Sequence, residues 1–318
     1  MKIQYARQMP LEDLLKGDFD LVIAASGYEE RCTHIASMFT NDMTRKAIGF
    51  RENRDNEQRL KNDAVFSDLG FEFYKNLVSE GNRYEVIAAM DSILAGLPFH
   101  DSIRILVDYS CMTRVWLSAF VNYFKFRNTQ YREVYIYFMY SPSEYTRPSG
   151  PRPNSYMGPI PGVFRIASES KPTALIMGLG YEESKAKGLV DFIEPEMAFA
   201  FYSKPAIYEK FVKDVEINNE EILHRLRSEA DVRVFTYPLH DLREMESKLM
   251  SIYFRLNQDY KVVLAPLGPK PFSLICLLVA EKFEDIDVWR VSSGIGGNIY
   301  SRRAADVDPI VCEVKYSR

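Results

Sequence analysis

The chain has 318 residues, of which 47% are apolar and 13% aromatic, enough for a large buried core and too many for wholesale disorder. A formal net charge of −4 argues against a general nucleic-acid coat protein but leaves room for a local basic pocket. The length suggests two domains or one two-lobed unit, and four scattered cysteines without a Cys-x-x-Cys pair predict neither a metal site nor a disulfide framework.

The first half of the chain alternates strand and helix patterns. Short apolar runs predict strands at residues 21–26, 46–50, 71–78, 103–109 and 134–140. Between them, apolar residues at helical spacing predict helices at residues 29–39, 56–69, 83–97 and 113–126. Residues 141–161 are rich in Pro, Gly, Ser and Tyr, which predicts a linker rather than a helix or a central strand.

The second half repeats this order. Strands are predicted at residues 173–179, 197–202, 232–237, 261–265 and 287–292, with a final strand at 310–315. Helices are predicted at residues 182–193, 206–229 (one long helix or a pair), 241–256 and 271–283. Alternating strands and helices indicate βαβ crossovers and a mostly parallel sheet. We therefore predict an α/β fold of two tandem Rossmann-like half-domains related by a pseudo-two-fold axis, at residues 1–145 and 171–318, with a linker at 146–170.

Two sequence patterns occur in both halves. An apolar run ending in Gly-Tyr-Glu-Glu occurs at residues 21–30 and again at 175–183, an offset of 153 (180 minus 27). The run at 105–114 matches 262–270, an offset of 156 (270 minus 114). Two matches at nearly one offset indicate an internal duplication. Ligands of open α/β sheets bind beyond the carboxyl ends of the strands, where strand order reverses, so these repeated loops are the candidate sites.

The loop after the first strand of each half combines glycine with an aromatic side chain. Gly27 and Gly180 allow a sharp turn and a close approach of ligand to backbone. Tyr28 and Tyr181 would either stack on a base or cap a sheet edge, and Ser26 lies beside this turn. The loop therefore predicts a ligand-binding position in both halves.

The glutamates of the same loop allow two interpretations. Glu29, Glu30 and Glu182, together with Glu183, would favour the positive end of a helix dipole, by about 0.3–1 kcal/mol each. Alternatively, one of these carboxylates contacts a ribose hydroxyl or acts as a general base, which requires a pKa raised by burial or by a neighbouring carboxylate. We retain Glu29, Glu30 and Glu182 as candidate catalytic residues.

The loop after the fourth strand predicts an anion site. Small polar residues precede a basic residue at a helix start, as Ser110, Cys111, Thr113 and Arg114 in the first half and as Gly268 and Lys270 in the second. A basic residue in a first helical turn opposes the helix dipole, so a phosphate partner explains it better than structure does. The Cys111 thiol should have a lowered pKa there, and it is either a nucleophile or a pocket-lining group. Ser293 and Gly294 follow the last strand of the second half and either bind phosphate through their amides or form a simple turn.

The segment Asp108-Tyr109-Ser110-Cys111-Met112-Thr113-Arg114 resembles the Asp-x-Thr-Gly-Gly-Thr-Lys loop of the CARF (CRISPR-associated Rossmann fold) family. Asp108, Thr113 and Arg114 match by type, while Cys111 and Met112 stand at the glycine positions. The resemblance implies paired Rossmann-like domains that bind a cyclic oligonucleotide between them. It implies a nucleotide-binding protein of bacterial antiviral defence, with Arg114 and Lys270 on phosphates, Tyr28 and Tyr181 on bases, and slow ligand hydrolysis as an option.

Two other functions remain open. One is a nucleoside or nucleotide hydrolase, an N-glycosidase or a phosphoester hydrolase, that uses the Gly-Tyr-Glu-Glu carboxylates; the other is a scaffold subunit that binds a protein partner in a defence complex. No apolar run approaches the roughly 18 residues of a membrane span. We therefore expect a cytoplasmic protein that needs no cofactor and neither enters membranes nor coats nucleic acids.

Overall fold

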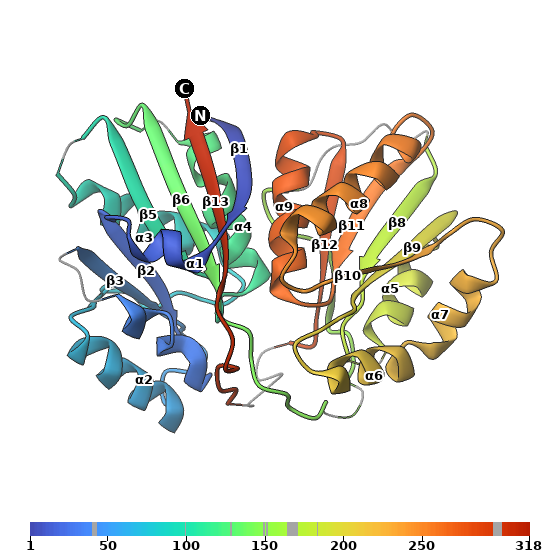
Figure 1. The fold of residues 1–318 in the computed structure, drawn as a ribbon, viewed down its shortest axis with the longest axis horizontal. Helices are drawn as coiled ribbons and strands as arrows, with labels where there is room; N and C mark the ends of the chain where they lie inside the picture. The colour runs from blue at the N-terminus through green and yellow to red at the C-terminus, as the bar shows by residue number, and fades with distance from the viewer. Residues whose placement is uncertain are drawn as a thin grey trace. The chain divides into compact units, whose positions relative to one another are not determined.

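The structure is a computed structural model that describes residues 1–39, 43–98, 100–127, 129–148, 150, 152–163, 171–182, 184–294 and 301–318. The chain forms two compact units (Figure 1). Unit 1 comprises Met1–Glu144 together with Asn298–Arg318, and unit 2 comprises Tyr145–Gly297. Each unit is built around one sheet of mostly parallel strands, which confirms the predicted α/β class.

Unit 1 contains a seven-stranded sheet in the order β1-β13-β6-β5-β2-β3-β4. These strands are β1 (Lys2–Met9), β2 (Leu21–Ser26), β3 (Thr44–Gly49), β4 (Glu72–Phe73), β5 (Ser102–Asp108), β6 (Glu133–Tyr140) and β13 (Ile310–Ser317). Strands β2 to β6 are parallel, and β13 runs antiparallel to both β6 and β1. The helices are α1 (Leu11–Leu15), α2 (Glu57–Asp68), α3 (Arg83–Ala95) and α4 (Arg114–Phe126).

Unit 2 repeats the five-strand parallel arrangement. Its sheet has the order β10-β9-β8-β11-β12-β7. These strands are β7 (Tyr156–Pro159), β8 (Thr173–Gly178), β9 (Met197–Ser203), β10 (Val234–Tyr237), β11 (Lys261–Pro266) and β12 (Ile286–Ser292). The helices are α5 (Lys185–Ile193), α6 (Glu209–Asn218), α7 (Glu220–Arg227), α8 (Leu242–Leu256) and α9 (Lys270–Lys282).

Strand order reverses at the same place in both units. The first parallel strand lies between the second and the fourth: β2 between β3 and β5, and β8 between β9 and β11. The loops that carry the duplicated patterns therefore follow the two strands that flank the reversal. In an open α/β sheet this is the position where ligands bind.

The central strands are buried because helices cover both faces of each sheet. All six residues of β2 are buried, as expected for a parallel strand without a solvent face. Val22 and Ala24 pack with Cys32 and with Phe66 of α2 on one face. In unit 2, Leu175 and Met177 of β8 pack with α5, α6 and α7. No helix in the described part of the chain is long and apolar enough to cross a membrane.

The domain boundaries differ from those predicted. Strand β13 was assigned to a second half at 171–318, but it pairs with β1 and β6 and so belongs to unit 1. Part of the predicted linker at 146–170 belongs to unit 2, where β7 pairs antiparallel with β12 at the sheet edge. An edge strand tolerates the prolines and glycines of this segment, because one of its sides needs no ladder bonds. Residues 164–170 lie outside the described residues.

Two predicted elements of unit 1 are wrong in type or length. The predicted helix at 29–39 is a pair of short 3₁₀ turns, η1 (Glu30–Thr33) and η2 (Ala36–Met38). The Cys32 amide donates to the Glu29 carbonyl at 3.1 Å, the spacing of a 3₁₀ turn, and Asn62 donates to the same carbonyl at 2.8 Å. The predicted strand at 71–78 shortens to β4, with Val78 forming an isolated bridge to Phe50.

Candidate functional site

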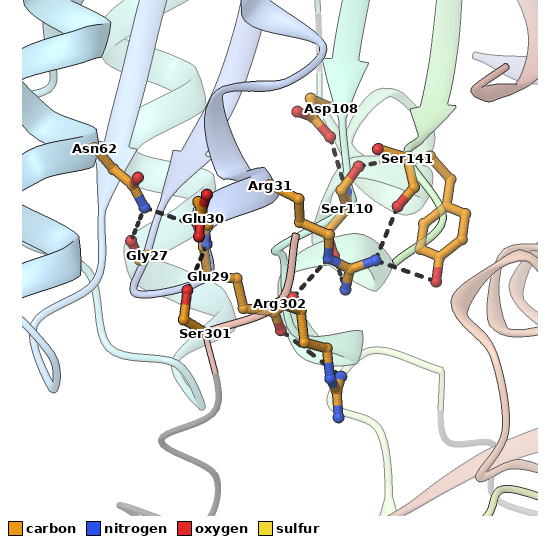
Figure 2. A network of polar contacts seen from close by, with 11 residues as sticks. Gly27, Glu29, Glu30, Arg31, Asn62, Asp108, Ser110, Ser141, Ser301 and Arg302 are labelled. Atoms are coloured by element: carbon orange, nitrogen blue, oxygen red, sulfur yellow. Dashed lines mark hydrogen bonds and ion pairs between the residues drawn. The ribbon is translucent and has the colours of Figure 1, made fainter. Parts of the chain in front are cut away.

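A buried arginine holds the loops at the carboxyl ends of β2, β5 and β6 together (Figure 2). The Arg31 side chain is 2% exposed, and its Nε donates to Glu29 Oε2 at 2.6 Å. Its Nη1 donates to the carbonyl of Ser141 at 2.8 Å, and its Nη2 donates to the carbonyl of Ser110 at 3.2 Å. One guanidinium therefore fixes three loops that are distant in sequence.

The charge of Arg31 is balanced within this network. Burial alone would lower the pKa of the Arg31 guanidinium, but the Glu29 carboxylate and the Tyr140 hydroxyl outweigh it and raise that pKa well above its usual value. The guanidinium also lies over the Tyr140 ring, 5.4 Å from its centroid. Arg31 is therefore a permanent buried cation whose donors are used within the fold.

Glu29 lies between two arginines. Arg31 contacts its Oε2, and Arg302 Nη1 lies 3.9 Å from its Oε1. The Glu29 side chain is 13% exposed and makes no capping bond to η1. The carboxylate therefore ties the loop to neighbouring cations, and helix-start electrostatics does not account for its position.

Arg302 reaches this loop on a segment that precedes β13. We call residues 301–305 the C-terminal strap. Two hydrogen bonds attach the strap to the loop after β2. Ser301 Oγ accepts from the Glu30 amide at 3.3 Å, and the Arg302 carbonyl accepts from the Arg31 amide. Across the strap, the Glu144 amide donates to the Arg303 carbonyl at 3.0 Å. The strap thus brings Arg302, a residue from the far end of the sequence, beside Glu29 (Figure 2).

Helix α2 fixes the other side of the same loop. Asn62 Nδ2 donates to the carbonyls of Gly27 and Glu29, each at 2.8 Å. The Ser26 hydroxyl donates to Asp63 Oδ1 at 2.5 Å. A Cβ at Gly27 would meet the Phe50 ring at 3.3 Å, so this glycine packs closely against protein.

Unit 2 repeats the asparagine bond. Asn219 Nδ2 donates to the carbonyl of Gly180 at 2.9 Å, as Asn62 does to Gly27. The offset between the two asparagines is 157 (219 minus 62), close to the offsets of the repeated sequence patterns. This third match supports the internal duplication on structural grounds. The sequence signal was a single asparagine, which lies inside α2 in unit 1 and between α6 and α7 in unit 2.

The glycines of unit 2 serve backbone packing between two loops. A Cβ at Gly180 would lie 2.8 Å from the Leu267 carbonyl oxygen, and one at Gly268 would lie 2.5 Å from the Leu179 carbonyl oxygen. The loops after β8 and β11 therefore touch through their main chains. A ligand is not needed to explain either glycine.

The loop after β5 is a tight polar turn. The Ser110 amide donates to Asp108 Oδ1 at 2.9 Å, and the Ser110 hydroxyl accepts from the Ser141 amide at 2.8 Å. Thr113 caps α4 by accepting from the Trp116 amide at 3.2 Å. Arg114 is the first residue of α4 and is half-buried. Thus Ser110 and Thr113 have structural roles here, and Arg114 stands at the helix start, as predicted.

The predicted low pKa of Cys111 is wrong. Burial raises the pKa of the Cys111 thiol well above its usual value, and a hydrogen bond with Cys32 and the Glu29 carboxylate raise it further. The Arg31 guanidinium lowers the same pKa but does not compensate. The helix start and Arg114 alone favour a thiolate, and no local sequence pattern reports that this thiol packs beside a second one.

Tyr28 faces the same cluster. It is half-buried, and its pKa is raised by burial first and then by the Glu29 carboxylate, while Arg302 opposes the rise. Cys111 and Glu80 raise the pKa of the Tyr28 hydroxyl further. Unit 1 therefore brings together Tyr28, Glu29, Cys111 and Arg302, three of which were predicted site residues.

Unit 2 places its predicted residues differently. Tyr181 packs against Phe211, with ring centroids 5.6 Å apart. Lys270 is the first residue of α9 and is half-buried, the same position that Arg114 has in α4. Gly294 has a φ of 86°, a left-handed conformation that favours glycine.

A serine with a buried hydroxyl follows the fifth parallel strand in both units. Ser141 follows β6, and Ser293 follows β12, an offset of 152 (293 minus 141). Among the described residues, neither side-chain hydroxyl has a hydrogen-bond partner. This correspondence is a further trace of the duplication.

The candidate catalytic glutamates are all ion-paired. Arg303 Nε lies 3.2 Å from Glu30, and Lys185 Nζ lies 2.6 Å from Glu182 Oε2. This ion pair joins Glu182 in the loop after β8 to Lys185, the first residue of α5. Glu183 lies outside the described residues, as do residues 295–298 of the loop after β12. The structure thus gives each of Glu29, Glu30 and Glu182 an ionic partner, and their catalytic role stays a prediction.

A separate cavity of about 490 Å³ opens at the opposite end of the unit 1 strands. Asp20, Thr44 and Ile103 line it, at the starts of β2, β3 and β5. None of the predicted site residues is among its lining residues. The cavity and the repeated loops therefore lie at opposite edges of the sheet.

Comparison with protein-family models finds no match for the chain. A comparison with curated proteins likewise finds no match.

Proposed function

We propose that the protein binds a phosphorylated nucleotide at the carboxyl ends of its parallel strands. The observation that carries this proposal is the repeated basic residue at a helix start. Arg114 begins α4 and Lys270 begins α9, each after the fourth parallel strand and beside the reversal of strand order. A cation at this end of a helix opposes the dipole, and a bound phosphate offsets that cost.

Two features of unit 1 support the same function. Arg31 and Asn62 hold the loop after β2 rigid before any ligand arrives, and preorganisation lowers the entropy cost of binding. Tyr28 lies in that loop and Arg302 lies beside it. The tyrosine ring suits stacking on a base, and the arginine suits pairing with a phosphate.

The resemblance to the CARF family favours a cyclic oligonucleotide as the ligand and a sensor role in bacterial antiviral defence. Binding through cations and an aromatic ring needs no general base. Hydrolysis would need one, and Glu29, Glu30 and Glu182 each make an ion pair. We therefore put the binding function before the hydrolase and the scaffold.

The proposal is tested by ligand-induced stabilisation of the whole protein. Cyclic oligonucleotides, linear oligonucleotides and mononucleotides are titrated while thermal unfolding is followed. A ligand at 100 times its Kd adds about 2.7 kcal/mol to the unfolding free energy, which gives a clear rise in Tm. No rise with any nucleotide would overturn the proposal.

Calorimetric titration of the variants then locates the site. Arg114→Ala, Lys270→Ala and Arg302→Ala should each weaken binding, since a charge-assisted hydrogen bond contributes about 1.5–3 kcal/mol, or about 10- to 150-fold in Kd. Arg303→Ala is the matched control, because Arg303 is 70% exposed and pairs with the exposed Glu30. Equal Kd values for all four variants and the natural protein would contradict the assignment of the site.

A further inference from the structure

Two cysteines from different loops meet at the site of unit 1. Cys32 lies in η1, after β2, and Cys111 lies in the turn after β5. Their side chains are hydrogen-bonded to one another, and Cys111 packs against the core cluster that contains Cys32. Both are free cysteines. The pair thus bridges the two loops that flank the reversal of strand order.

The network around Arg31 explains why the thiols meet. Arg31 immediately precedes Cys32 in the chain, and Ser110 immediately precedes Cys111. The bond from Arg31 Nη2 to the Ser110 carbonyl, at 3.2 Å, therefore joins the residues next to both cysteines. Because Arg31 is buried and also bound to Glu29 and Ser141, the two loops are held in register.

The two thiols differ in access. Cys32 is 1% exposed, whereas Cys111 is half-buried. A small oxidant therefore reaches Cys111 first, and the Cys32 thiol interacts with it. Cys111 is thus the more accessible thiol of the pair, and Cys32 is placed as its resolving cysteine.

We propose that Cys32 and Cys111 form a reversible disulfide when a hydroperoxide oxidises the protein. The Cys111 thiolate attacks one peroxide oxygen, the O–O bond breaks, and Cys111 becomes a sulfenic acid while hydroxide leaves. The Cys32 sulfur then attacks the Cys111 sulfur, the S–O bond breaks, and the hydroxyl leaves with the Cys32 proton as water. Overall, two thiols and one hydrogen peroxide give one disulfide and two waters. This proposal is independent of nucleotide binding.

The rate should depend on pH. The thiolate is the nucleophile, and burial raises the pKa of Cys111, so little thiolate exists at neutral pH. Raising the pH towards that pKa increases the thiolate fraction, so oxidation by hydrogen peroxide should accelerate from pH 7 to pH 9.

Peptide mapping of the intact protein tests the proposal. The protein is treated with hydrogen peroxide, unfolded, alkylated and digested, and the peptides are weighed by mass spectrometry. We expect the Cys32 and Cys111 peptides to be joined, and both thiols to return after reduction. Cys276 and Cys312, which are buried elsewhere, should remain alkylatable. In Cys32→Ser the Cys111 sulfenic acid should persist long enough to be trapped by dimedone.

Cys276→Ala is the matched control, since it removes a buried cysteine of α9 in unit 2 and should give the natural yield of disulfide. Three results would overturn the proposal: no oxidation even at pH 9, overoxidation of Cys111 while Cys32 stays a free thiol, or a disulfide with another partner. All three are read from the natural protein, so they do not depend on the folding of a variant.

Discussion

The single residue Arg31 connects three loops of unit 1. Its guanidinium donates to Glu29 and to the carbonyls of Ser110 and Ser141. These buried acceptors on three loops are thereby satisfied without water. A buried cation is tolerated because a carboxylate and several acceptors surround it. The same donors are arranged as a planar fork, which lysine cannot reproduce.

We predict that Arg31→Ala lowers the free energy of unfolding by about 3–5 kcal/mol, because it leaves the Glu29 carboxylate and two carbonyls without their donor. Urea unfolding measures the change. Arg303→Ala, which removes an exposed ion pair, should cost at most about 1 kcal/mol. Similar losses in the two variants would show that Arg31 does not hold the loops.

The role of Arg31 could not be predicted from the repeat. The pattern Gly-Tyr-Glu-Glu is followed by Arg31 in the first half and by Ser184 in the second, so the duplication gave no signal at this position. Arg302 was missed for a different reason. Its approach to Glu29 depends on a chain segment more than two hundred residues away, and no local pattern reports such a contact.

At the scale of elements, the buried strands were the most predictable part of the fold. Parallel strands covered on both faces are apolar throughout, and this produced the correct positions of β2, β5, β8 and β11. Strand β1 was not predicted from the sequence. Its residues alternate irregularly between exposed and half-buried positions, so they give no regular apolar pattern. The helix predicted after β2 is replaced by 3₁₀ turns, in which the Glu29 carbonyl accepts from the Cys32 amide and from Asn62.

The loops after β8 and β11 supply a test at this scale. Gly268→Ala should lower the unfolding free energy by about 1–3 kcal/mol, because the new Cβ would stand 2.5 Å from the Leu179 carbonyl oxygen and must push the two main chains apart. Gly150→Ala in the same unit is the control, since no atom of the described residues lies within 4 Å of its added Cβ. Chemical denaturation of both variants gives the comparison, and equal stability would argue against contact between these loops.

At the scale of the whole molecule, unit 1 is discontinuous in sequence. Its sheet is completed by β13, which the chain supplies only after unit 2. The sequence predicted the existence of this strand but not its sheet, because strand pairing between distant segments leaves no local pattern. The two duplicated five-strand arrangements, by contrast, follow directly from alternating elements with short connections.

Removal of residues 310–318 should therefore unfold unit 1 and spare unit 2. Strand β13 lies between β1 and β6, so its loss leaves backbone groups of both strands unpaired. Limited proteolysis should then cut within residues 1–144 and leave 145–294 protected. Deletion of Arg318 alone is the control. Protection of residues 1–144 in the longer deletion would show that β13 is dispensable.

The late position of β13 also sets an order of events during protein synthesis. As the chain leaves the ribosome, β1 and β6 emerge early, and all of unit 2 follows before β13 appears. Unit 2 has its whole sequence available first and can fold as the chain grows, since domains generally fold as units during translation. Until β13 emerges, the sheet of unit 1 lacks the strand between β1 and β6, and the unpaired edges of those strands favour aggregation.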